Sequence, residues 1–291
     1  MKKNRNPAFD RIAIVGVGLL GGSIGLAVKQ RGLAREVVGI GRSPNSLKEA
    51  LDLQVVDEVT TDLAEGIAEA DLVILCTPVR HIVSILPEVL TKARGGALVT
   101  DVGSTKNTIV ETAERVGSSA FFVGSHPMAG SEKSGVRYAN ADLFEDTTCF
   151  VTPTPQTSWN AFGRICGFWR ALGCRLAVAR PDRHDVLVAL ISHLPHLVAV
   201  ALVRAVESMK EDQNLIKGII GNGFRDTTRI ACGNTQMWED ICTENHEAIC
   251  RMHEAFTRSL AELLEAQQAN PTALQNYLNE ACQYRRFLDN R

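Results

Sequence analysis

The chain has 291 residues, a length that corresponds to two domains of ordinary size. Its 31 basic and 33 acidic residues give a formal net charge of −2, so no basic excess points to nucleic acid or to an anionic lipid surface. Hydrophobic residues make up 45% and charged residues 22%, which is typical of a folded globular protein and excludes a disordered chain.

The N-terminal sequence MKKNRNPAFD is charged and has no apolar segment before the first strand, which argues against a secretory signal. Eight scattered cysteines without a CxxC pair are typical of reduced thiols in the cytosol. The apolar segment 185–203 approaches membrane-spanning length, but it carries His193, Pro195 and His196 in its middle. We therefore expect a buried helix, no membrane span and a cytoplasmic protein.

Apolar, β-branched runs alternate with helical patterns along the N-terminal part of the chain. Strands are predicted at 11–16, 37–40, 72–76, 97–101 and 121–124, with helices at 20–30, 44–51, 80–90 and 106–116. Two more strands, at 149–152 and 175–179, flank an amphipathic stretch at 159–172 and are expected to extend the same sheet. Short apolar strands separated by helices predict a mostly parallel sheet that is covered on both faces.

The pattern changes at Pro181, after which apolar residues recur at helical spacing. Breaks between helices are predicted at 221–223, 233–234 and 270–271, where Gly, Asn and Pro occur. The fold class is therefore α/β: a Rossmann-type domain over residues 1–180, followed by an all-helical domain over residues 181–291.

A glycine-rich segment follows the first strand and opens a helix. Its residues are Gly16, Gly18, Leu19, Leu20 and Gly21. The first glycine permits a tight turn, the second lets the backbone approach a pyrophosphate, and the third lets helix and strand pack closely. With strand, glycines and helix in this order, we expect the helix N-terminus to bind a dinucleotide.

The end of the second strand bears on the choice of dinucleotide. A site that prefers NAD usually has an acidic residue there, but this chain has Gly41, followed by Arg42 and Ser43. Without a carboxylate to repel it, a 2′-phosphate could be bound by Arg42 and Ser43, which favours NADP over NAD. The alternative is a solvated arginine ahead of a helix cap.

Polar residues also follow the later strands of the sheet. They are Thr77 and Pro78 after the strand at 72–76, Asp101, Gly103 and Ser104 after the strand at 97–101, and Ser125 and His126 after the strand at 121–124. Ligands of open α/β sheets bind beyond the carboxyl ends of the strands, so these turns are expected to face one site. Thr77, Pro78, Asp101 and Gly103 are predicted to contact the cofactor.

His126 is a candidate acid or base, because imidazole titrates near neutrality. Ser104 is placed to orient it or to touch a substrate. The alternatives are a histidine that only makes structural hydrogen bonds and a serine that only caps the following helix.

Five segments in this order resemble the prephenate and arogenate dehydrogenase family of tyrosine biosynthesis: GVGLLGGS, DVGSTK, SHPMAGSEKSG, SHLPH and GFRDTTRIA. The resemblance runs from Arg11 to at least Ile249. It implies NAD(P)-dependent oxidative decarboxylation, in which a hydride leaves the ring carbon that bears the 4-hydroxyl group while the ring loses carbon dioxide and becomes aromatic.

The resemblance also implies roles for individual residues. His126 matches the catalytic histidine that accepts a hydrogen bond from the 4-hydroxyl group, and Ser104 matches the serine beside it. Arg229 matches the arginine that binds a substrate carboxylate.

Further substrate-binding residues are inferred in the same way. His193 and His196 match paired histidines of the helical domain, and Ser125 lies next to the catalytic residue. Glu132 and Asp226 match acidic residues of an ionic network at the site entrance, although a solvated loop pair is the alternative. Asp226 could also meet the amine of arogenate, which leaves the choice of substrate open.

Cys242, His246, Cys250 and His253 recur at spacings that place them along one face of a single helix. A straight helix cannot wrap four ligands around one ion, so we expect a packed stripe and no metal.

Two other functions remain open. One is a β-hydroxyacid or imine dehydrogenase, although such enzymes typically use a lysine of the helical domain. The other is a protein that binds NADP as a sensor. Whatever the function, the helical domain has more apolar surface than a thin layer of helices can hide. A homodimer is therefore expected, from this pattern and from the family resemblance.

Overall fold

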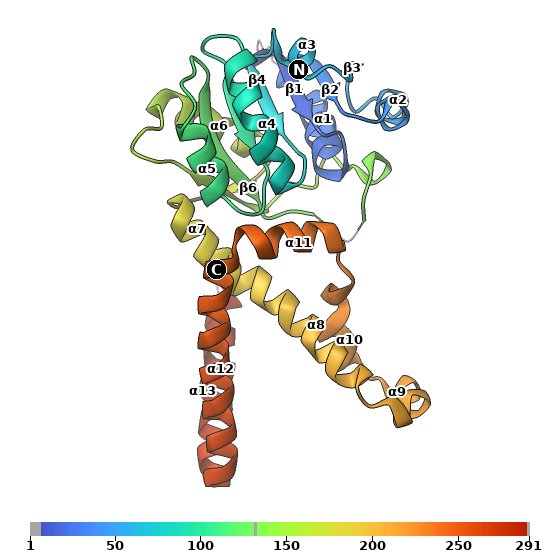
Figure 1. The fold of residues 1–291 in the computed structure, drawn as a ribbon, viewed down its shortest axis with the longest axis vertical. Coiled ribbons are helices and arrows are strands. Elements are labelled where there is room, and N and C mark those ends of the chain that lie inside the picture. The colour runs from blue at the N-terminus through green and yellow to red at the C-terminus, as the bar shows by residue number, and fades with distance from the viewer. Residues whose placement is uncertain (1–6, 131–132, 290–291) are drawn as a thin grey trace, which may run out of the picture.

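Eight strands form one sheet in the order β3-β2-β1-β4-β5-β6-β7-β8 (Figure 1). The computed structural model describes residues 7–130 and 133–289. The strands are β1 (Phe9–Val15), β2 (Ala34–Ile40), β3 (Glu58–Thr60), β4 (Leu72–Leu75), β5 (Leu98–Asp101), β6 (Phe121–Pro127), β7 (Thr148–Thr152) and β8 (Arg175–Val178).

The sheet is mostly parallel, which confirms the predicted fold class. Strands β1 to β6 run in one direction, β7 is antiparallel to β6, and β8 is parallel to β7. The two late strands extend the same sheet, as expected. Because β1 lies between β2 and β4, the strand order reverses beside it, and ligands of such sheets bind at this point.

Helices cover both faces of the sheet. Helices α1 (Leu19–Arg31), α2 (Pro44–Asp52) and α6 (Trp159–Ala171) share one apolar core, and α3 (Leu63–Ile67), α4 (Val79–Lys92) and α5 (Asn107–Glu114) share the other. Successive residues of β1 point to opposite cores: Ile14 joins Ile24 of α1, whereas Val15 joins Ile82 of α4. Burial on both faces explains why the strands are continuous apolar runs.

The elements β3 and α3 were not predicted from the sequence. They contain three and five residues, which is too short for an alternating or helical period to be recognised. The other predicted elements of the sheet domain lie within a few residues of their observed bounds.

Residues 136–140, which precede β7, pack against the first helix. The turn η1 (Val136–Tyr138) contacts α1, where a side chain at Gly22 would crowd Val136 and Ala139 at 3.0 Å. The backbone N–H of Asn140 donates to Ser23 Oγ at 2.9 Å. The exit from β6 is thereby attached to the helix that opens with the glycine-rich segment.

The remaining chain is helical. Its elements are α7 (Pro181–Val188), η2 (Ala189–His193), α8 (Leu194–Glu207), η3 (Lys210–Asp212), α9 (Gln213–Ile219), α10 (Asn222–Thr228), η4 (Arg229–Cys232), α11 (Thr235–Glu244), α12 (His246–Ala269) and α13 (Pro271–Asp289). The breaks predicted near residues 221, 233 and 270 are confirmed. Within this run, η2 is a π-helical turn that joins α7 to α8.

The expected single helix through Cys242 and His253 is wrong. Asn245 ends α11 and precedes α12, so Cys242 lies on one helix while His246, Cys250 and His253 lie on the next. The latter three side chains are exposed, so they do not form a packed stripe in this chain.

The segment from Pro181 to Glu207 is only partly buried, which corrects the expected core helix. By length and composition it could cross a membrane, with a mean hydropathy of 2.3 over its most apolar window, and a third of that window is buried. One side packs inward, whereas Leu190 and Ile191 are 48% and 60% exposed.

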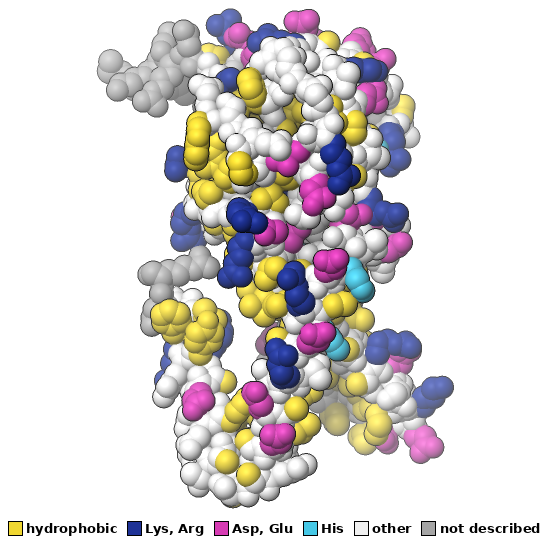
Figure 2. Space-filling model, turned by 60° about the vertical axis from the view of Figure 1, so that its left-hand side comes forward, with side chains coloured by type: hydrophobic (Ala, Val, Ile, Leu, Met, Phe, Trp, Pro, Cys, Tyr) yellow, Lys and Arg dark blue, Asp and Glu magenta, His cyan; other side chains and the backbone are white. Residues whose placement is uncertain are grey.

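Helices α12 and α13 form an antiparallel pair that projects from the rest of the chain, and α8 extends in another direction (Figure 1). The pair exposes Phe256, Leu260 and Leu264 at helical spacing. Hydrophobic side chains are visible on the helices in the lower half of Figure 2. A large apolar surface of the helical part is therefore uncovered in a single chain.

Candidate active site

The loop between β1 and α1 has the backbone that a dinucleotide requires. Gly16 has a φ of +96°, and a side chain there would lie 2.8 Å from the Thr77 methyl carbon, so this loop and the turn after β4 are adjacent. A side chain at Gly21 would overlap the carbonyl oxygen of Gly16, whereas the space in front of Gly18 is open. Because Gly18 caps α1 without a side-chain hydrogen bond, the first-turn amides are accessible to a phosphate, so the loop fits a pyrophosphate.

The turn after β2 lies beside this loop. The N–H of Gly16 donates to the carbonyl of Ile40 at 2.8 Å, and Ser43 caps α2 by accepting from the N–H of Ser46 at 3.3 Å. Arg42 is exposed, and no acidic residue ends the strand. Burial lowers the pKa of His81 on α4, and so does the charge of Arg42, which places the guanidinium near the turn after β4.

Pro78 and Thr77 begin α4 beside the glycine-rich loop. Pro78 is the N-cap residue and is exposed. Thr77 is half-buried, and its hydroxyl lies 3.1 Å from His81 Nδ1. Both residues therefore lie where a dinucleotide at α1 would reach them.

The carboxylate of Asp101, a residue predicted to contact the cofactor, organises the turn after β5. It accepts from the N–H groups of Gly103 at 2.8 Å and Ser125 at 3.1 Å, and it forms a fully buried ion pair with Lys106. Both oxygens of this fully buried side chain are thus engaged inside the protein.

Ser125 was expected to bind substrate, but its side chain is fully buried. The hydroxyl lies 2.9 Å from Thr100 Oγ1, so its hydrogen-bonding capacity is used between β5 and β6. Ser104 is half-buried at the bend before α5 and lies three residues after Asp101, at the same edge of the sheet.

His126 lies near the carboxyl end of β6 and is half-buried. Its Nδ1 is 2.9 Å from Nε2 of His184 on α7, and the two rings meet edge to face. Burial lowers the pKa of His126 well below its ordinary value, and the nearby charges of His184, Lys106 and His193 lower it further. The imidazole is therefore neutral at pH 7 and can accept a proton.

Asp185 joins the two parts of the chain. Its carboxylate accepts from His184 Nδ1 at 2.8 Å and from the N–H groups of Lys106 at 2.8 Å and Asn107 at 2.9 Å. The last two groups begin α5, so a residue of α7 caps a helix of the sheet domain.

A second group of aromatic and amide side chains continues from Asp185. Asn245 Nδ2 donates to the carbonyl of Asp185 at 2.8 Å and lies 3.1 Å from His193 Nδ1. Trp238 meets the edge of His193 and stacks on His196, with ring centroids 3.5 Å apart and planes within 8°. These contacts bring the predicted residues His126, His193 and His196 into one continuous network.

The histidines of this network are held neutral by burial. Burial lowers the pKa of His193 to about 4 against the opposing charge of Asp185, and it also lowers the pKa of His196. His196 is 4% exposed, and its Nδ1 is buried without a hydrogen-bond partner among the described residues. The hydrogen-bonding capacity of that nitrogen is therefore unused among the described residues.

Arg229 and Asp226 lie away from this network. Both are exposed, Asp226 on α10 and Arg229 on η4, beside α8. The chain next to Arg229 does reach the network, because the backbone of Ile230 hydrogen-bonds His196. Glu132 lies outside the described residues.

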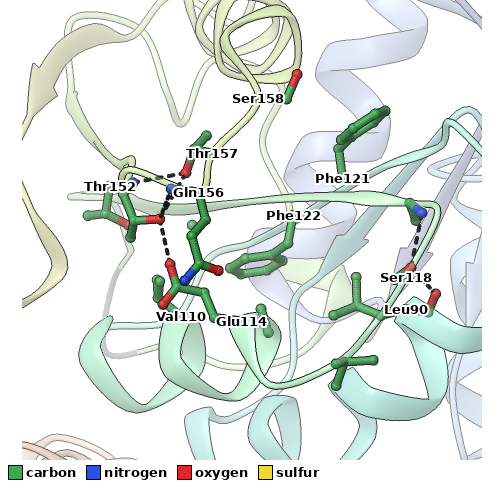
Figure 3. A pocket seen from close by; sticks show the side chains of 15 residues that line it. Leu90, Val110, Glu114, Ser118, Phe121, Phe122, Thr152, Gln156, Thr157 and Ser158 are labelled. Carbon is green, nitrogen blue, oxygen red and sulfur yellow. Dashed lines mark hydrogen bonds between the residues drawn. The ribbon is translucent and has the colours of Figure 1, made fainter.

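A cavity of about 290 Å³ lies elsewhere, between α5, β6 and the loop after β7 (Figure 3). Its lining includes Glu114, Phe121, Phe122 and Thr152 and contains none of the predicted site residues. Among residues 7–130 and 133–289, no cluster of three or more His, Cys, Asp or Glu side chains is arranged to hold a metal ion.

Sequence reasoning missed several residues of the site. His184, Asp185, Asn245 and Trp238 all contact the predicted histidines directly or through one another. A signal for two of them was present, because His184 and Asp185 are adjacent polar residues at the start of a strongly apolar segment. Nothing in the spacing identified Asn245 or Trp238.

Comparisons with known proteins identify the family of the chain. Residues 24–178 match the family described as "Prephenate dehydrogenase, nucleotide-binding domain", and residues 180–280 match "Prephenate dehydrogenase, dimerization domain". The chain belongs to the prephenate dehydrogenase family. Its fold is thus that of a member of this family of oxidoreductases.

Individual relatives cover nearly the whole chain. The prephenate dehydrogenase of Bacillus subtilis is 35% identical over 286 residues, which are 96% of this chain and 76% of that protein. A crystal structure of prephenate dehydrogenase from A. aeolicus in complex with hydroxyphenyl propionate and NAD+ is 34% identical, with a TM-score of 0.86, and the match covers 96% of this chain and 98% of that one.

A crystal structure of Synechocystis arogenate dehydrogenase is 30% identical to this family member, with a TM-score of 0.82 and coverage of 96% and 99%. Family membership favours an enzyme over a cofactor sensor and over the β-hydroxyacid alternative. It does not distinguish prephenate from arogenate as the substrate, because relatives of both kinds match.

The lowered pKa of His193 predicts how stability depends on pH. The unfolded chain binds a proton at this residue below its ordinary pKa of 6.5, whereas the folded chain does so only near pH 4. Its contribution to stability is therefore complete above pH 6.5 and is lost as pH falls towards 4, by at most about 1.4 kcal/mol per pH unit. Urea unfolding of His193→Asn at a fixed protein concentration is expected to show a shallower decline over this range.

The matched control for this measurement is His253→Asn, since His253 is exposed on α12. This variant is expected to keep the pH dependence of the parent. An unchanged slope in His193→Asn would contradict the assignment.

Proposed function

We propose that this chain catalyses the NAD(P)-dependent oxidative decarboxylation of prephenate to 4-hydroxyphenylpyruvate, or of arogenate to tyrosine. The observation that carries the proposal is the state of His126. It is a neutral imidazole at the end of a sheet strand, anchored through one ring nitrogen, so that the other is left to accept a proton.

The reaction needs little more than position and one proton acceptor. The C–H bond at the hydroxyl-bearing ring carbon breaks and its electron pair leaves with the hydride, while the hydroxyl proton moves to His126. The bond to the ring carboxylate then breaks, carbon dioxide leaves, and the electron pair of that bond completes the aromatic ring. The proton held by His126 returns to the oxygen, and aromatisation drives the sequence.

The nicotinamide of the coenzyme, when bound, supplies the hydride acceptor. The chain's part is to hold the pyrophosphate at the loop of Gly16, Gly18 and Gly21, with Leu19 and Leu20 opening α1. Gly41, Arg42 and Ser43 lie at the adenosine end in this arrangement. We favour NADP, because Arg42 is exposed beside the loop and no carboxylate opposes a 2′-phosphate, although the hydroxyl of Ser43 is partly engaged as a helix cap.

The substrate is a carboxylate-bearing ring, and we assign its contacts to the remaining residues. Ser104 lies at the same strand edge as His126 and is assigned to the hydroxyl group. His196 has a buried Nδ1 without a hydrogen-bond partner among the described residues. His193 contacts Trp238, on which the ring of His196 stacks. Arg229 is assigned to a carboxylate, since it precedes Ile230, whose backbone contacts His196. Asp226, on the preceding helix α10, is assigned to the site entrance.

The quaternary arrangement and location follow from the surface. We propose that residues 1–180 and 181–291 are the two domains and that two copies pair through the helical one. The exposed apolar residues of α8, α12 and α13 support the pairing, because a second copy would cover them. A cytoplasmic enzyme without membrane or nucleic-acid partners is consistent with the net charge of −2.

Four reaction mixtures test the function: prephenate or arogenate with NAD+ or NADP+. Reduced nicotinamide is followed by absorbance, and carbon dioxide release is measured in parallel. Equal formation of the two is expected for one substrate. A failure to reduce either coenzyme with either substrate would refute the proposal.

His126→Asn is expected to lower kcat by about 100- to 10,000-fold, the usual contribution of a general acid or base, because the proton acceptor is lost. Coenzyme affinity, measured by fluorescence titration, should change little. His253→Asn is the control, and near-normal turnover of His126→Asn would remove His126 from the mechanism.

Arg229→Ala is expected to raise the KM for the substrate by about 10- to 100-fold, the worth of a charged hydrogen bond, with a smaller change in kcat. Arg225→Ala removes an exposed arginine from the preceding helix α10 and should leave KM unchanged. Steady-state kinetics separate the two, and an unaltered KM in Arg229→Ala would contradict its role.

Arg42→Ala is expected to weaken NADP+ binding by about tenfold or more while NAD+ binding changes by less than about twofold, since the guanidinium is assigned to the 2′-phosphate. Lys48→Ala, an exposed cation on α2, is the control. Equal losses for both coenzymes in a binding titration would show that Arg42 does not distinguish them.

A further inference from the structure

One ring nitrogen of His126, Nδ1, has a defined partner. It lies 2.9 Å from His184 Nε2, and the His184 ring is fully buried between His126 and Phe150, meeting both rings edge to face. A buried contact between two ring nitrogens requires that one carries hydrogen and the other does not. Which of them carries it decides what His126 can do on its other side.

Asp185 decides the question. A carboxylate only accepts hydrogen bonds, and this one already accepts from two backbone N–H groups at the start of α5. His184 Nδ1, at 2.8 Å from Asp185 Oδ1, must therefore carry a hydrogen. A neutral His184 then has a bare Nε2, so the hydrogen between the two rings belongs to Nδ1 of His126.

We infer that His184 and Asp185 are positioning residues that hold His126 as the Nδ1–H tautomer, with Nε2 bare towards the 4-hydroxyl group of the substrate. The inference rests on the proposed function for its catalytic consequence, whereas the tautomer itself does not depend on any substrate. It adds two residues to the site whose effect on catalysis is exerted through His126.

The surroundings of the pair are consistent with this assignment. The charged and titratable groups that face the two rings are Asp185 on α7, Lys106 with its partner Asp101 between β5 and α5, and His193 on η2. Lys106 is paired with Asp101, so the carboxylate of Asp185 is the negative group in direct contact with the histidine pair. When Nε2 of His126 takes the hydroxyl proton, the new positive charge is stabilised through His184 by that carboxylate.

The same three residues couple catalysis to the packing of the two parts of the chain. His184 and Asp185 lie on α7, whereas His126 lies on β6 and the capped amides lie on α5. The tautomer of His126 is therefore set only when α7 is docked against the sheet.

The tautomer can be read directly from the coenzyme-free protein. Histidine labelled with 15N in the ring gives long-range proton–nitrogen correlations that distinguish a protonated from a bare ring nitrogen, and His126→Asn identifies the signals of His126. We expect a protonated Nδ1 and a bare Nε2. A protonated Nε2 on neutral His126 would overturn the inference, whether or not the enzyme turns over either substrate.

Kinetics of two variants provide the second test. His184→Phe keeps a buried ring but offers no acceptor, so kcat is expected to fall by about tenfold or more with little change in either KM. His184→Gln places an amide oxygen where it can accept from Nδ1 and is expected to recover most of the lost rate. Equal kcat in His184→Phe and the parent, or no recovery with His184→Gln, would contradict the role.

The control is His253→Phe, which makes the same substitution at an exposed position. Circular dichroism and light scattering of each variant show whether it folds and assembles as the parent does. If His184→Phe does not fold, the parent spectrum and His184→Gln still decide the matter. Absence of turnover in the parent, by contrast, would refute the proposed function and leave the tautomer result standing.

Discussion

The carboxylate of Asp185 is the interaction on which the site depends. It accepts from two amides that begin a helix of the sheet domain and from a histidine ring of its own helix, and its backbone carbonyl accepts from Asn245. Each bond to a charged acceptor contributes roughly 1.5–3 kcal/mol, and removal of the acceptor would leave buried donors unsatisfied. The packing of α7 on the sheet and the orientation of His184 are consequences of one side chain.

A second constraint is the absence of charge on the buried imidazoles. Burial lowers the pKa of all four imidazoles: His126, His184, His193 and His196. Of the charged groups nearby, Lys106 is paired with Asp101, and the carboxylate of Asp185 accepts hydrogen bonds from His184 and from two backbone N–H groups. A site of this kind starts with uncharged acceptors, so the positive charge that forms on proton transfer is new and can be stabilised selectively as the reaction proceeds.

The sheet was predictable because burial on both faces leaves apolar runs with helices between them, and the glycine-rich loop because its backbone requirements are local. Residues that act across the chain were not. His184 lies 58 residues from His126, and their contact depends on how α7 docks. The buried hydrogen bonds of Asp101 and Ser125 could not be recognised from residue type. The exposure of Arg229 depends on how α10 and η4 pack on α8, which the sequence does not show.

The π-helical turn at Ala189–His193 adds one residue to a run that otherwise continues as α-helix from Pro181 to Glu207. An α-helix advances about 100° per residue, so the insertion rotates α8 about its axis relative to α7. The turn therefore sets the rotational phase between the end that packs on the sheet and the end that carries His196. The residues of α7 that anchor the helix to the sheet and the residue of α8 that faces Trp238 therefore point in directions that an uninterrupted α-helix would not combine.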